Sequence, residues 1–227
     1  MSIAPRPIDY GAPGWGMLAR ELRTVVNPRR LAPPPASLTR QVGAGRPVLV
    51  IPGFLASDGS TRPLRVGLGE AGFRAHGWGR GRNLGLRDDV LAAVDARIAQ
   101  ISRGQPVALV GWSLGGLIAR EYAKRAPGAV SRVVTLGSPI CGDPRRNNNV
   151  WRVYEWVAGH PVDAPPLPCA LEEKPPVETV AIWSRQDGIV AGHAARGASD
   201  RAVEIGCGHI EMVFAPEAIR AVVDALA

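Results

Sequence analysis

The sequence predicts an α/β fold in which a mostly parallel sheet of about six strands carries helices on both faces. Three observations predict it. From residue 47 onward, short apolar runs alternate with amphipathic segments. Several of these runs are apolar almost throughout, as is typical of strands that are buried on both faces. With 227 residues and 46% hydrophobic content, the chain is long enough for one such domain with a sizeable core.

The expected strands and helices alternate along the chain. Strands are expected at residues 48–51, 73–77, 106–111, 132–137, 177–183 and 201–206. Helices are expected near residues 61–71, 87–102, 114–125, 189–196 and 215–226. Helices that join parallel strands in this way form right-handed crossovers, which cover both faces of the sheet.

The most informative motif is Gly111-Trp112-Ser113-Leu114-Gly115, which matches the pattern Gly-x-Ser-x-Gly. It lies between an expected buried strand and an expected helix. In this setting the serine occupies a strained turn. The two glycines are needed because a side chain at either position would collide with the neighbouring strand and helix. The turn presents the hydroxyl at the end of the sheet, and Ser113 is therefore the predicted nucleophile.

A serine nucleophile needs a base, and on such a turn the partners follow in the order serine, acid, histidine. His209 lies in a Gly-rich loop after the last expected strand, where it can swing over the serine. His76 precedes the serine, so its order is wrong, and His160 and His193 lie in polar or Pro-rich stretches. We therefore predict that His209 is the base.

Asp187 is the predicted acid that orients this histidine. It follows the expected strand 177–183, which is the strand before the one that leads to His209. An aspartate before a glycine is also typical of a plain turn. The rival acids are Asp143 and Asp163, which follow an earlier strand, and Glu211, which is too near the histidine in sequence to reach its far nitrogen comfortably.

Two backbone N–H groups are expected to form an oxyanion hole, because such donors stabilise the tetrahedral oxyanion. One belongs to Leu114, directly after the serine. The other belongs to Phe54, in the loop 52–56 that follows the first expected strand. Gly53 allows the backbone of this loop to turn towards the serine.

Together these motifs resemble the α/β-hydrolases of the serine esterase/lipase type. The resemblance runs from about Arg46 to Ala227, and many relatives have His-Gly where this chain has Pro52-Gly53. It rests on Pro52-Gly53-Phe54, Gly111 to Gly116, Val133 to Pro139, Ser184 to Val190, and Gly208-His209. Within it, Leu136-Gly137-Ser138-Pro139 is similar to bacterial lipase-like members. Pro63-Leu64 and residues 77–83 are similar to a bacterial subgroup of hydrolases, for which a fold and a chemistry are implied but no substrate.

Residues 140–176 make an unusually long connection for a compact domain. They hold Trp151, Tyr154 and Trp156 in a short expected helix and then return through a Pro-rich stretch. In the fold that the resemblance implies, an insert at this point lies over the active site. We therefore expect a small cap, or lid, that lines an acyl pocket. A surface elaboration whose aromatic residues merely pack down is the alternative.

Residues 1–45 form an arm ahead of the α/β-hydrolase domain, which is expected to cover residues 46–227. The arm contains an expected amphipathic helix within residues 14–26 and a stiff connector of three prolines at 33–35. The apolar stripe of the helix consists of Trp15, Leu18, Leu22, Val25 and Val26. We expect this stripe to pack on the body of the protein. A helix that touches a membrane or forms a dimer is the alternative.

The net charge of +7 and the isoelectric point near 10.1 raise the question of an anionic partner. The arginines are scattered, and the aromatic residues are not interleaved with them. We expect no nucleic-acid partner and at most a weak attraction to acidic surfaces. No continuous apolar stretch marks a signal peptide in residues 1–20, and no run approaches the ~20 residues that span a bilayer. The cytoplasm is therefore the default location, without membrane insertion.

The three cysteines form no disulfide framework, although a bridge between Cys141 and Cys169 is left open. Cys207 lies two residues before His209, but no strand-to-helix turn surrounds it, so a cysteine nucleophile is disfavoured. No set of His, Cys and carboxylate residues has the spacing of metal ligands, and the Gly-rich stretch 77–85 lacks the setting of a nucleotide-binding loop. We expect neither a metal nor an organic cofactor.

The sequence thus predicts a serine hydrolase that cleaves carboxylic esters of small molecules through an acyl-enzyme. The candidates for contact with the substrate are Trp112, Trp151, Tyr154 and Trp156. Acyl transfer and thioester hydrolysis use the same catalytic residues and are alternatives. A third alternative is a non-catalytic binding protein on the same scaffold. The natural ester and the oligomeric state do not follow from the sequence, because the fold and the chemistry are shared by many substrates.

Overall fold

The structure is a computed structural model that describes residues 11–26, 41–167 and 169–227. In this part of the chain six strands form one sheet in the order β2-β1-β3-β4-β5-β6, and every neighbouring pair is parallel. The strands are β1 (Pro47–Ile51), β2 (Arg74–Gly77), β3 (Val107–Trp112), β4 (Val130–Leu136), β5 (Thr179–Ser184) and β6 (Arg201–Ile205). The predicted fold class is confirmed, and all six expected strands are present with small shifts of their bounds.

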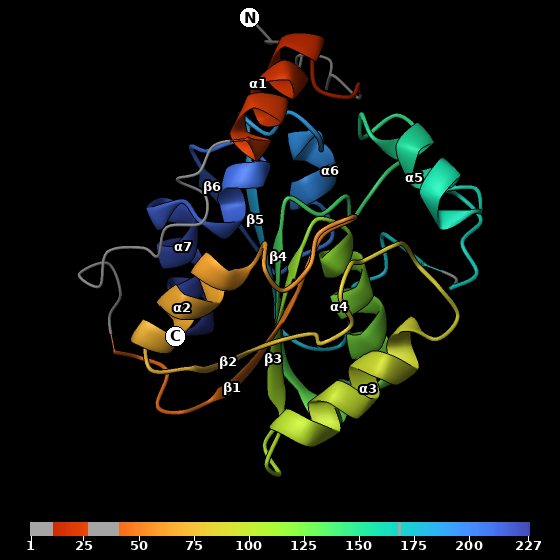
Figure 1. Cartoon of the computed structure of the whole chain (residues 1–227). Helices are drawn as coiled ribbons and strands as arrows, with labels where there is room; N and C mark the ends of the chain where they lie inside the picture. The colour runs from red at the N-terminus through yellow and green to blue at the C-terminus, as the bar shows by residue number, and fades with distance from the viewer. Residues whose placement is uncertain (1–10, 27–40, 168) are drawn as a thin grey trace, which may run out of the picture.

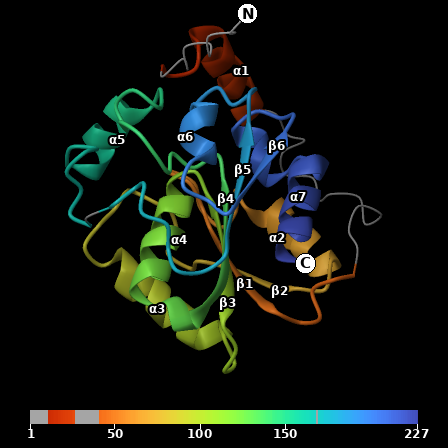
Figure 2. The same ribbon diagram turned by 180° about the vertical axis from the view of Figure 1, so that it is seen from behind.

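Helices cover both faces of this sheet (Figures 1 and 2). On one face lie α2 (Arg62–Glu70) and α7 (Pro216–Leu226), and on the other lie α3 (Val90–Ile101) and α4 (Leu114–Arg125). The expected helix at 189–196 is present as the shorter α6 (Gly192–Arg196). Two short 3-10 helices, η3 (Pro127–Ala129) and η4 (Ile210–Val213), are additional to the expected elements.

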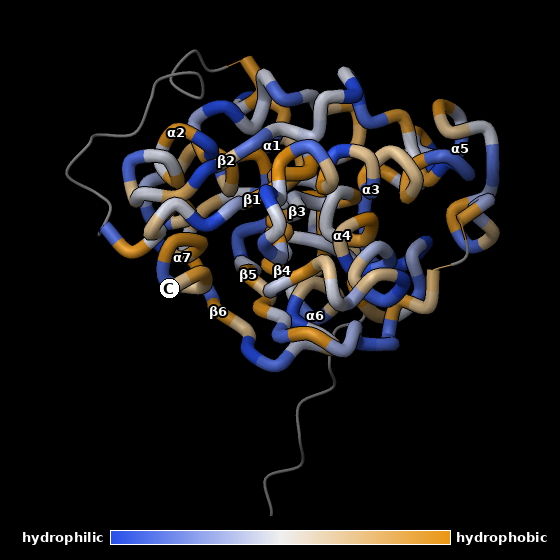
Figure 3. Tube along the Cα trace, turned by 90° about the horizontal axis from the view of Figure 1, so that it is seen from below, coloured by the Kyte–Doolittle hydropathy of each residue, from blue (hydrophilic) through white to orange (hydrophobic). Residues whose placement is uncertain are grey.

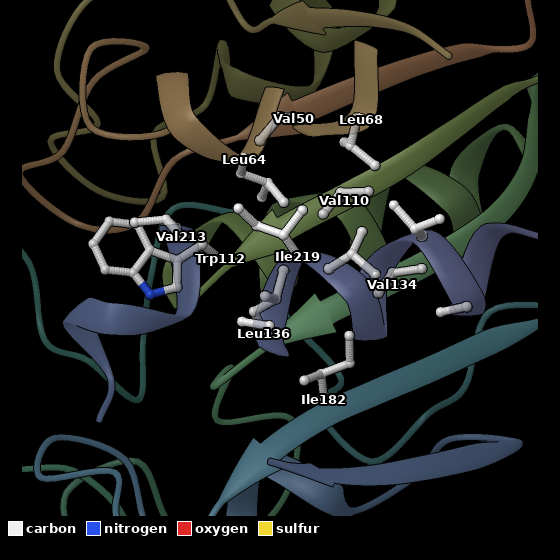
Figure 4. Packing of buried hydrophobic residues seen from close by; sticks show 14 of the residues in the cluster. Val50, Leu64, Leu68, Val110, Trp112, Val134, Leu136, Ile182, Val213 and Ile219 are labelled. Atoms are coloured by element: carbon white, nitrogen blue, oxygen red, sulfur yellow. The ribbon is translucent and has the colours of Figure 1, made fainter. Parts of the chain in front are cut away.

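Two apolar layers hold the sheet between its helices. Because side chains of a strand point alternately to the two faces, Val48 and Val50 of β1 face α2 and α7, while Leu49 and Ile51 face α3 and α4. The first layer is shown in Figure 4, where Ile219 of α7 lies among side chains of α2 and of the central strands. In Figure 3 the hydropathy colouring of α7 includes orange, apolar stretches. The core thus fixes the strands whose carboxyl ends carry the candidate site.

The insert at residues 140–176 is docked on the body of the protein. It contains α5 (Trp151–Ala158), whose Tyr154 hydroxyl accepts the backbone N–H of Leu86 at 3.1 Å. The returning segment is held by the buried guanidinium of Arg120 on α4, which donates to the carbonyl oxygens of Leu171 at 3.2 Å and Glu173 at 3.0 Å. The same guanidinium donates to the carbonyl of Ala198 at 2.8 Å. The insert is therefore held by hydrogen bonds to α4, the helix that follows Ser113.

The N-terminal helix α1 (Trp15–Val25) lies at the carboxyl ends of the strands, next to α6 (Figures 1 and 2). The expectation that its apolar stripe packs on the body is wrong. The side chains of Trp15, Leu22 and Val26 are 82%, 64% and 81% exposed, whereas Glu21 is only 2% exposed. The reason is that the carboxylate of Glu21 accepts hydrogen bonds from the body of the protein. These bonds orient the helix so that Trp15, Leu22 and Val26 point outwards. The connector at 33–35 lies outside the described residues.

No helix in the described ranges is both long enough and apolar enough to cross a membrane.

Candidate active site

Ser113 occupies the turn between β3 and α4, as the Gly-x-Ser-x-Gly motif predicts. Its φ of 54° and ψ of −122° are rare for a residue with a side chain, and its backbone N–H donates to the carbonyl of Leu136 at 2.8 Å. A Cβ at Gly111 would lie 2.4 Å from the backbone of α4, and one at Gly115 would lie 2.2 Å from the carbonyl oxygen of Ile51. The strand and the helix approach so closely that both positions require glycine. These are the features of a nucleophile elbow.

Asp187 and His209 form a buried pair at the ends of β5 and β6. The Nδ1 of His209 lies 2.7 Å from Oδ2 of Asp187, and each residue is 2% exposed. The other carboxylate oxygen, Oδ1, accepts the backbone N–H groups of Ile189 and Val190, both at 2.8 Å. These two hydrogen bonds hold the carboxylate in place, so that one oxygen is aimed at the imidazole. With a proton on Nδ1, the neutral ring keeps Nε2 as an acceptor.

The pKa of His209 is set by opposing effects. Burial disfavours the charged imidazolium and lowers the pKa, whereas the charge of Asp187, its hydrogen bond and the charge of Glu21 raise it. The carboxylates outweigh burial, and the pKa of His209 is raised above its usual value of 6.5. The environment therefore favours the imidazolium that forms when this histidine accepts a proton.

The rival acids lie elsewhere. The carboxylate of Glu211 accepts the backbone N–H of Gly208 at 2.8 Å, and that of Asp143 accepts a backbone N–H of its own turn at 2.8 Å. Asp163 forms a salt bridge of 2.8 Å with Arg145. Among the described residues, none of these three carboxylates is hydrogen-bonded to the imidazole of His209.

The pair of Asp187 and His209 lies beside the elbow, against the end of β4. A Cβ at Gly137 would lie 2.9 Å from Asp187 Oδ2 and equally close to His209 Nδ1. Gly137 directly follows Leu136, whose carbonyl accepts the N–H of Ser113. No hydrogen bond joins the hydroxyl of Ser113 to His209 in the described part of the chain. In enzymes without substrate this contact is often long, and it tightens when substrate binds.

Trp112 is placed differently from the prediction that it contacts substrate. Its ring is 6% exposed within the apolar layer against α2 and α7 (Figure 4). Its indole Nε1–H donates to the carbonyl oxygen of His209 at 3.1 Å, and the two rings are 5.7 Å apart. Because consecutive strand residues point to opposite faces, Trp112 faces away from the cavity described below. It supports the loop of the histidine instead.

The two predicted oxyanion donors border the serine. A Cβ at Gly53 would lie 3.1 Å from the Cβ of Ser113, so the loop after β1 passes directly over the elbow. Within the described residues, the backbone N–H groups of Phe54 and Leu114 have no hydrogen-bond acceptor. Buried backbone N–H groups are nearly always paired in folded proteins. Two unpaired donors beside one serine can therefore bind an oxyanion.

Asn83 shapes this loop and was not singled out from the sequence. It is fully buried, and its side-chain Nδ2–H donates to the carbonyl of Pro52 at 2.8 Å. Its backbone accepts from Leu55 and donates to Ala56, both at 2.8 Å. The signal in the sequence that could have indicated this role is a single amide side chain within the Gly-rich stretch 77–85. A polar residue in such a stretch is normally interpreted as part of an exposed loop.

A cavity of about 270 Å³ opens beside Ser113 and is lined mainly by apolar side chains. Trp151 and Tyr154 of α5 line it, as predicted, and Tyr154 lies against the ring of Phe54 with centroids 5.2 Å apart. Other lining residues are Leu86, Leu117, Pro139, Val162, Leu171 and Val190. Trp156 is not among the lining residues, and it is 84% exposed. Residues three apart share one face of a helix, whereas Trp156 falls on the opposite face of α5.

Cys169 lines the cavity, but its thiol, like that of Cys207, is a poor candidate for a nucleophile. All three cysteines are free, so the bridge between Cys141 and Cys169 that the sequence left open is not formed. Burial raises the pKa of Cys169 to about 12 and raises that of Cys207 as well. Both thiols therefore stay protonated near neutral pH and are poor nucleophiles. In the ranges that the structure describes, no three His, Cys, Asp or Glu residues are grouped to hold a metal ion.

Glu21 is the second residue that the sequence analysis missed. Its carboxylate, carried by α1, accepts backbone N–H groups of Gly188, His209 and Ile210 at 3.0, 2.7 and 2.9 Å. These donors belong to the loops that carry Asp187 and His209, the predicted acid and base. A single glutamate on an amphipathic helix normally lies in the solvated face, so no local signal in the sequence marks it.

The site can now be compared with known proteins. The family model described as "alpha/beta hydrolase fold" matches residues 46–164 of this chain. A pimeloyl-[acyl-carrier protein] methyl ester esterase of Shewanella woodyi is 32% identical over 103 residues, which are 44% of this chain and 39% of that protein. The match thus spans about two fifths of the length of this curated relative.

Several solved structures share the fold. One comes from a study of the metagenome-derived lipolytic enzymes LipS and LipT, with 18% identity, a TM-score of 0.57, and coverage of 82% of this chain and 94% of that one. The naproxen esterase of Bacillus subtilis has 13% identity, a TM-score of 0.53 and coverage of 82% and 85%. A thioesterase domain from the curacin biosynthetic pathway has 14% identity, a TM-score of 0.53 and coverage of 81% and 92%. At such identities the likeness shows the fold alone.

The family model covers just over half of the chain, and the parallel sheet with its helices on both faces agrees with it. The chain belongs to the alpha/beta hydrolase fold family.

Proposed function

We propose that this protein is a serine hydrolase that cleaves carboxylic esters of small molecules with an apolar acyl group. One observation carries the proposal. Ser113 and the two unpaired N–H groups of Phe54 and Leu114 border a single apolar cavity, and the buried pair of Asp187 and His209 lies beside the same elbow. A site that only binds a ligand would not require this combination.

In the proposed reaction, Ser113 Oγ attacks the acyl carbon while His209 Nε2 takes the hydroxyl proton. Asp187 holds the opposite ring nitrogen and stabilises the imidazolium. The N–H groups of Phe54 and Leu114 bind the oxyanion, and each such donor typically contributes roughly 3–4 kcal/mol of barrier reduction. The C–O bond to the alcohol then breaks, and His209 returns the proton to the leaving alkoxide. Water then attacks the acyl carbon of the acyl-enzyme while His209 takes one of its protons. The bond from the acyl carbon to Ser113 Oγ breaks, His209 returns the proton to Oγ, and the carboxylic acid leaves.

The cavity supports an apolar acyl group as the recognised part of the substrate. Its walls are mainly aliphatic and aromatic side chains of α5, of the returning segment and of the loops after β1 and β2. Burying each CH₂ group of an acyl chain contributes ~0.8 kcal/mol. The curated relative is named for action on the methyl ester of a pimeloyl group, which also makes a carboxylic ester a reasonable substrate class.

Thioester hydrolysis and acyl transfer use the same residues and differ in the leaving group or the acceptor. They are tested in the same assay by offering oxygen esters and thioesters of one acyl group, with and without an added alcohol. We expect the oxygen ester to give the higher kcat/KM and water to be the acceptor.

The test of the proposed function combines covalent labelling and turnover. Wild-type protein is treated with a fluorophosphonate, the labelled residue is located by mass spectrometry, and p-nitrophenyl esters from acetate to octanoate are assayed. We expect one label, on Ser113, and turnover of the esters. Ser113→Ala, checked for folding by circular dichroism, should show neither. Labelling and turnover by this variant, or a wild-type protein that shows neither, would refute the proposal.

A further inference from the structure

Helix α1 is packed with its polar side inwards. Its one fully buried side chain is that of Glu21, while its large apolar side chains Trp15 and Leu22 are exposed. Burial of a carboxylate is unfavourable unless charge-assisted hydrogen bonds replace those to water. The orientation of this helix is therefore set by the polar contacts of Glu21 rather than by apolar burial.

These contacts join two loops. The acid loop follows β5 and carries Asp187, and the histidine loop follows β6 and carries His209. Glu21 Oε1 accepts the backbone N–H of Gly188 at 3.0 Å and that of His209 at 2.7 Å, and Oε2 accepts the N–H of Ile210 at 2.9 Å. Gly188 is the residue after Asp187. One carboxylate thus bridges the backbone beside the acid and the backbone of the base itself. Hydrogen bonds to an ionised acceptor are stronger than those between neutral groups.

The close approach of α1 to these loops explains why two positions beside the site are glycine. A Cβ at Gly188 would lie 2.5 Å from the carbonyl oxygen of Met17, and one at Gly208 would lie 2.7 Å from Glu21 Oε1. Neither glycine has the positive φ that would favour glycine for backbone reasons. The chain therefore has glycine next to Asp187 and next to His209 at two points where α1 leaves no room for a side chain.

Further hydrogen bonds fix α1 on the same loops. The Arg20 guanidinium donates to the backbone carbonyl of Gln186, which precedes Asp187. Asn149 Nδ2–H donates to the carbonyl of Pro13 at 2.8 Å and to that of Gly188 at 3.0 Å. The helix is thus held to the acid loop and to the cap segment as well as to the histidine loop.

We propose that Glu21 is a positioning residue of the active site, which fixes the spacing between the acid loop and the histidine loop and makes the N-terminal helix part of the catalytic machinery. The inference rests on the proposed roles of Ser113, Asp187 and His209. Because small displacements of catalytic groups can cost about a hundredfold in rate, a bridge between the two loops affects kcat without touching the substrate.

The charge of Glu21 adds a second effect. The titratable groups around His209 are Asp187 from the loop after β5, Glu21 from α1, and Cys207 and Glu211 from its own loop. Of these, Asp187 and Glu21 favour the charged imidazole and raise the pKa of His209. Removal of the negative charge of Glu21 should therefore lower that pKa, which a purely structural role would not require.

Glu21→Gln tests both effects, because it keeps the shape of the side chain but loses the charge and turns an N–H donor towards one backbone N–H. We expect kcat to fall about ten- to a hundredfold, with KM of short esters unchanged. The pKa of His209, followed by NMR titration and assigned with His209→Asn, should fall. Glu21→Asp keeps the charge at a shorter reach and should recover part of the pKa and part of kcat.

Glu217→Gln is the matched control. The carboxylate of Glu217 accepts the backbone N–H of Gly206 at 3.1 Å, in the segment that leads to the same histidine loop. Within the described residues it forms no hydrogen bond with the loop that carries Asp187. This variant should keep the wild-type kcat and the wild-type pKa of His209. All variants are compared at equal folded fraction, measured by circular dichroism and urea unfolding.

The NMR titration needs no turnover, so it separates the two proposals. A wild-type protein without labelling or turnover refutes the proposed function, whereas wild-type kcat and an unchanged pKa of His209 in folded Glu21→Gln overturn the role of Glu21. A loss of kcat that only follows a loss of folded protein, with that pKa unchanged, also overturns it. If Glu21→Gln does not fold, Glu21→Asp and Gly208→Ala replace it. Gly208→Ala displaces the carboxylate and should reduce kcat similarly, and wild-type values in both would decide against the proposal.

Discussion

The indole N–H of Trp112 donates to the carbonyl oxygen of His209 across 3.1 Å, although the two residues are 97 positions apart in the chain. Trp112 directly precedes Ser113, so one buried side chain connects the elbow to the loop of the proposed base. The tryptophan ring is fixed by the apolar layer around it. This hydrogen bond therefore relates the position of the histidine loop to that of the serine before any substrate is bound.

Trp112→Phe removes this hydrogen bond and keeps an aromatic ring in the layer. The carbonyl oxygen of His209 then keeps only the longer hydrogen bond from the backbone N–H of Met212, at 3.4 Å. Loss of the indole donor should cost about 0.5–1.5 kcal/mol of unfolding free energy. We expect kcat to fall several-fold while KM changes little. Urea unfolding and kcat for a short ester measure the two effects. Trp156→Phe is the control, because Trp156 is exposed, and equal effects in both variants would contradict the assigned role.

Asp187→Asn should reduce kcat by about 10⁴, because an amide in place of the carboxylate favours the wrong tautomer of the histidine. The substitution is nearly isosteric, so the fold should be kept. Asp143→Asn serves as the control and should leave kcat near the wild-type value. A large loss in Asp143→Asn with near-normal activity in Asp187→Asn would transfer the role of the acid to the segment after β4.

The pH dependence of kcat/KM should show an acidic limb with its midpoint above 6.5, since the pKa of His209 is raised. As the pH falls through that pKa, the imidazole becomes protonated and can no longer accept the serine proton, so activity is lost. Initial rates with an acetate ester at constant ionic strength give the profile. Activity that returns when an acidified sample is brought back to alkaline buffer shows that the loss is protonation and not unfolding. A midpoint at or below 6.5 would contradict the assigned environment.

Trp151→Ala should flatten the dependence of kcat/KM on acyl length. Each added CH₂ group that is buried contributes ~0.8 kcal/mol, so the wild-type enzyme should gain several-fold for every two carbons until the cavity is filled. Trp151 lines that cavity, whereas Trp156 on the opposite face of α5 does not. Acetate through octanoate esters are compared in wild-type protein, Trp151→Ala and Trp156→Ala. If both variants keep the wild-type slope, the acyl group binds elsewhere.

Asn83→Ala should lower kcat for every ester by the same factor. Without the bond from Asn83 to the carbonyl of Pro52, the N–H of Phe54 is no longer held towards the serine, and loss of one oxyanion donor costs about 10²–10³ in kcat. We therefore expect a decrease of up to about a hundredfold. The acyl-length series provides the internal control, because a defect at the oxyanion is common to acetate and octanoate. An effect that grows with chain length would mean that Asn83 shapes the acyl pocket instead.

The candidate catalytic residues could be predicted because of the geometry of a parallel sheet. Ser113, Asp187 and His209 follow β3, β5 and β6, and the carboxyl ends of parallel strands lie on the same edge. Their order along the chain therefore carries spatial information. The same reasoning placed the N–H of Phe54 after β1. In each case a local signal, an apolar run followed by a turn, was enough to locate the residue.

Glu21 and Asn83 could not be found in this way, because their partners are remote in sequence. The donors to Glu21 lie 167 to 189 positions further along the chain, and the apolar stripe of α1 predicted the opposite orientation. Periodicity shows that a helix has two faces, but not which one meets the protein. For α5 the same periodicity, applied to Trp151, Tyr154 and Trp156, would have separated the two lining residues from the exposed one.

The hydrogen bonds of Arg120 have a consequence for how the cavity beside Ser113 can change in evolution. The buried guanidinium holds the carbonyls of Leu171 and Glu173 to α4, the helix that begins directly after Ser113. An insertion or deletion in residues 171–173 would shift these acceptors and leave the buried guanidinium, among the described residues, with the carbonyl of Ala198 as its remaining hydrogen-bond partner, at a cost in stability. Evolution of the cavity should therefore proceed by exchange of lining side chains such as Leu171, one position at a time, on a backbone of constant length.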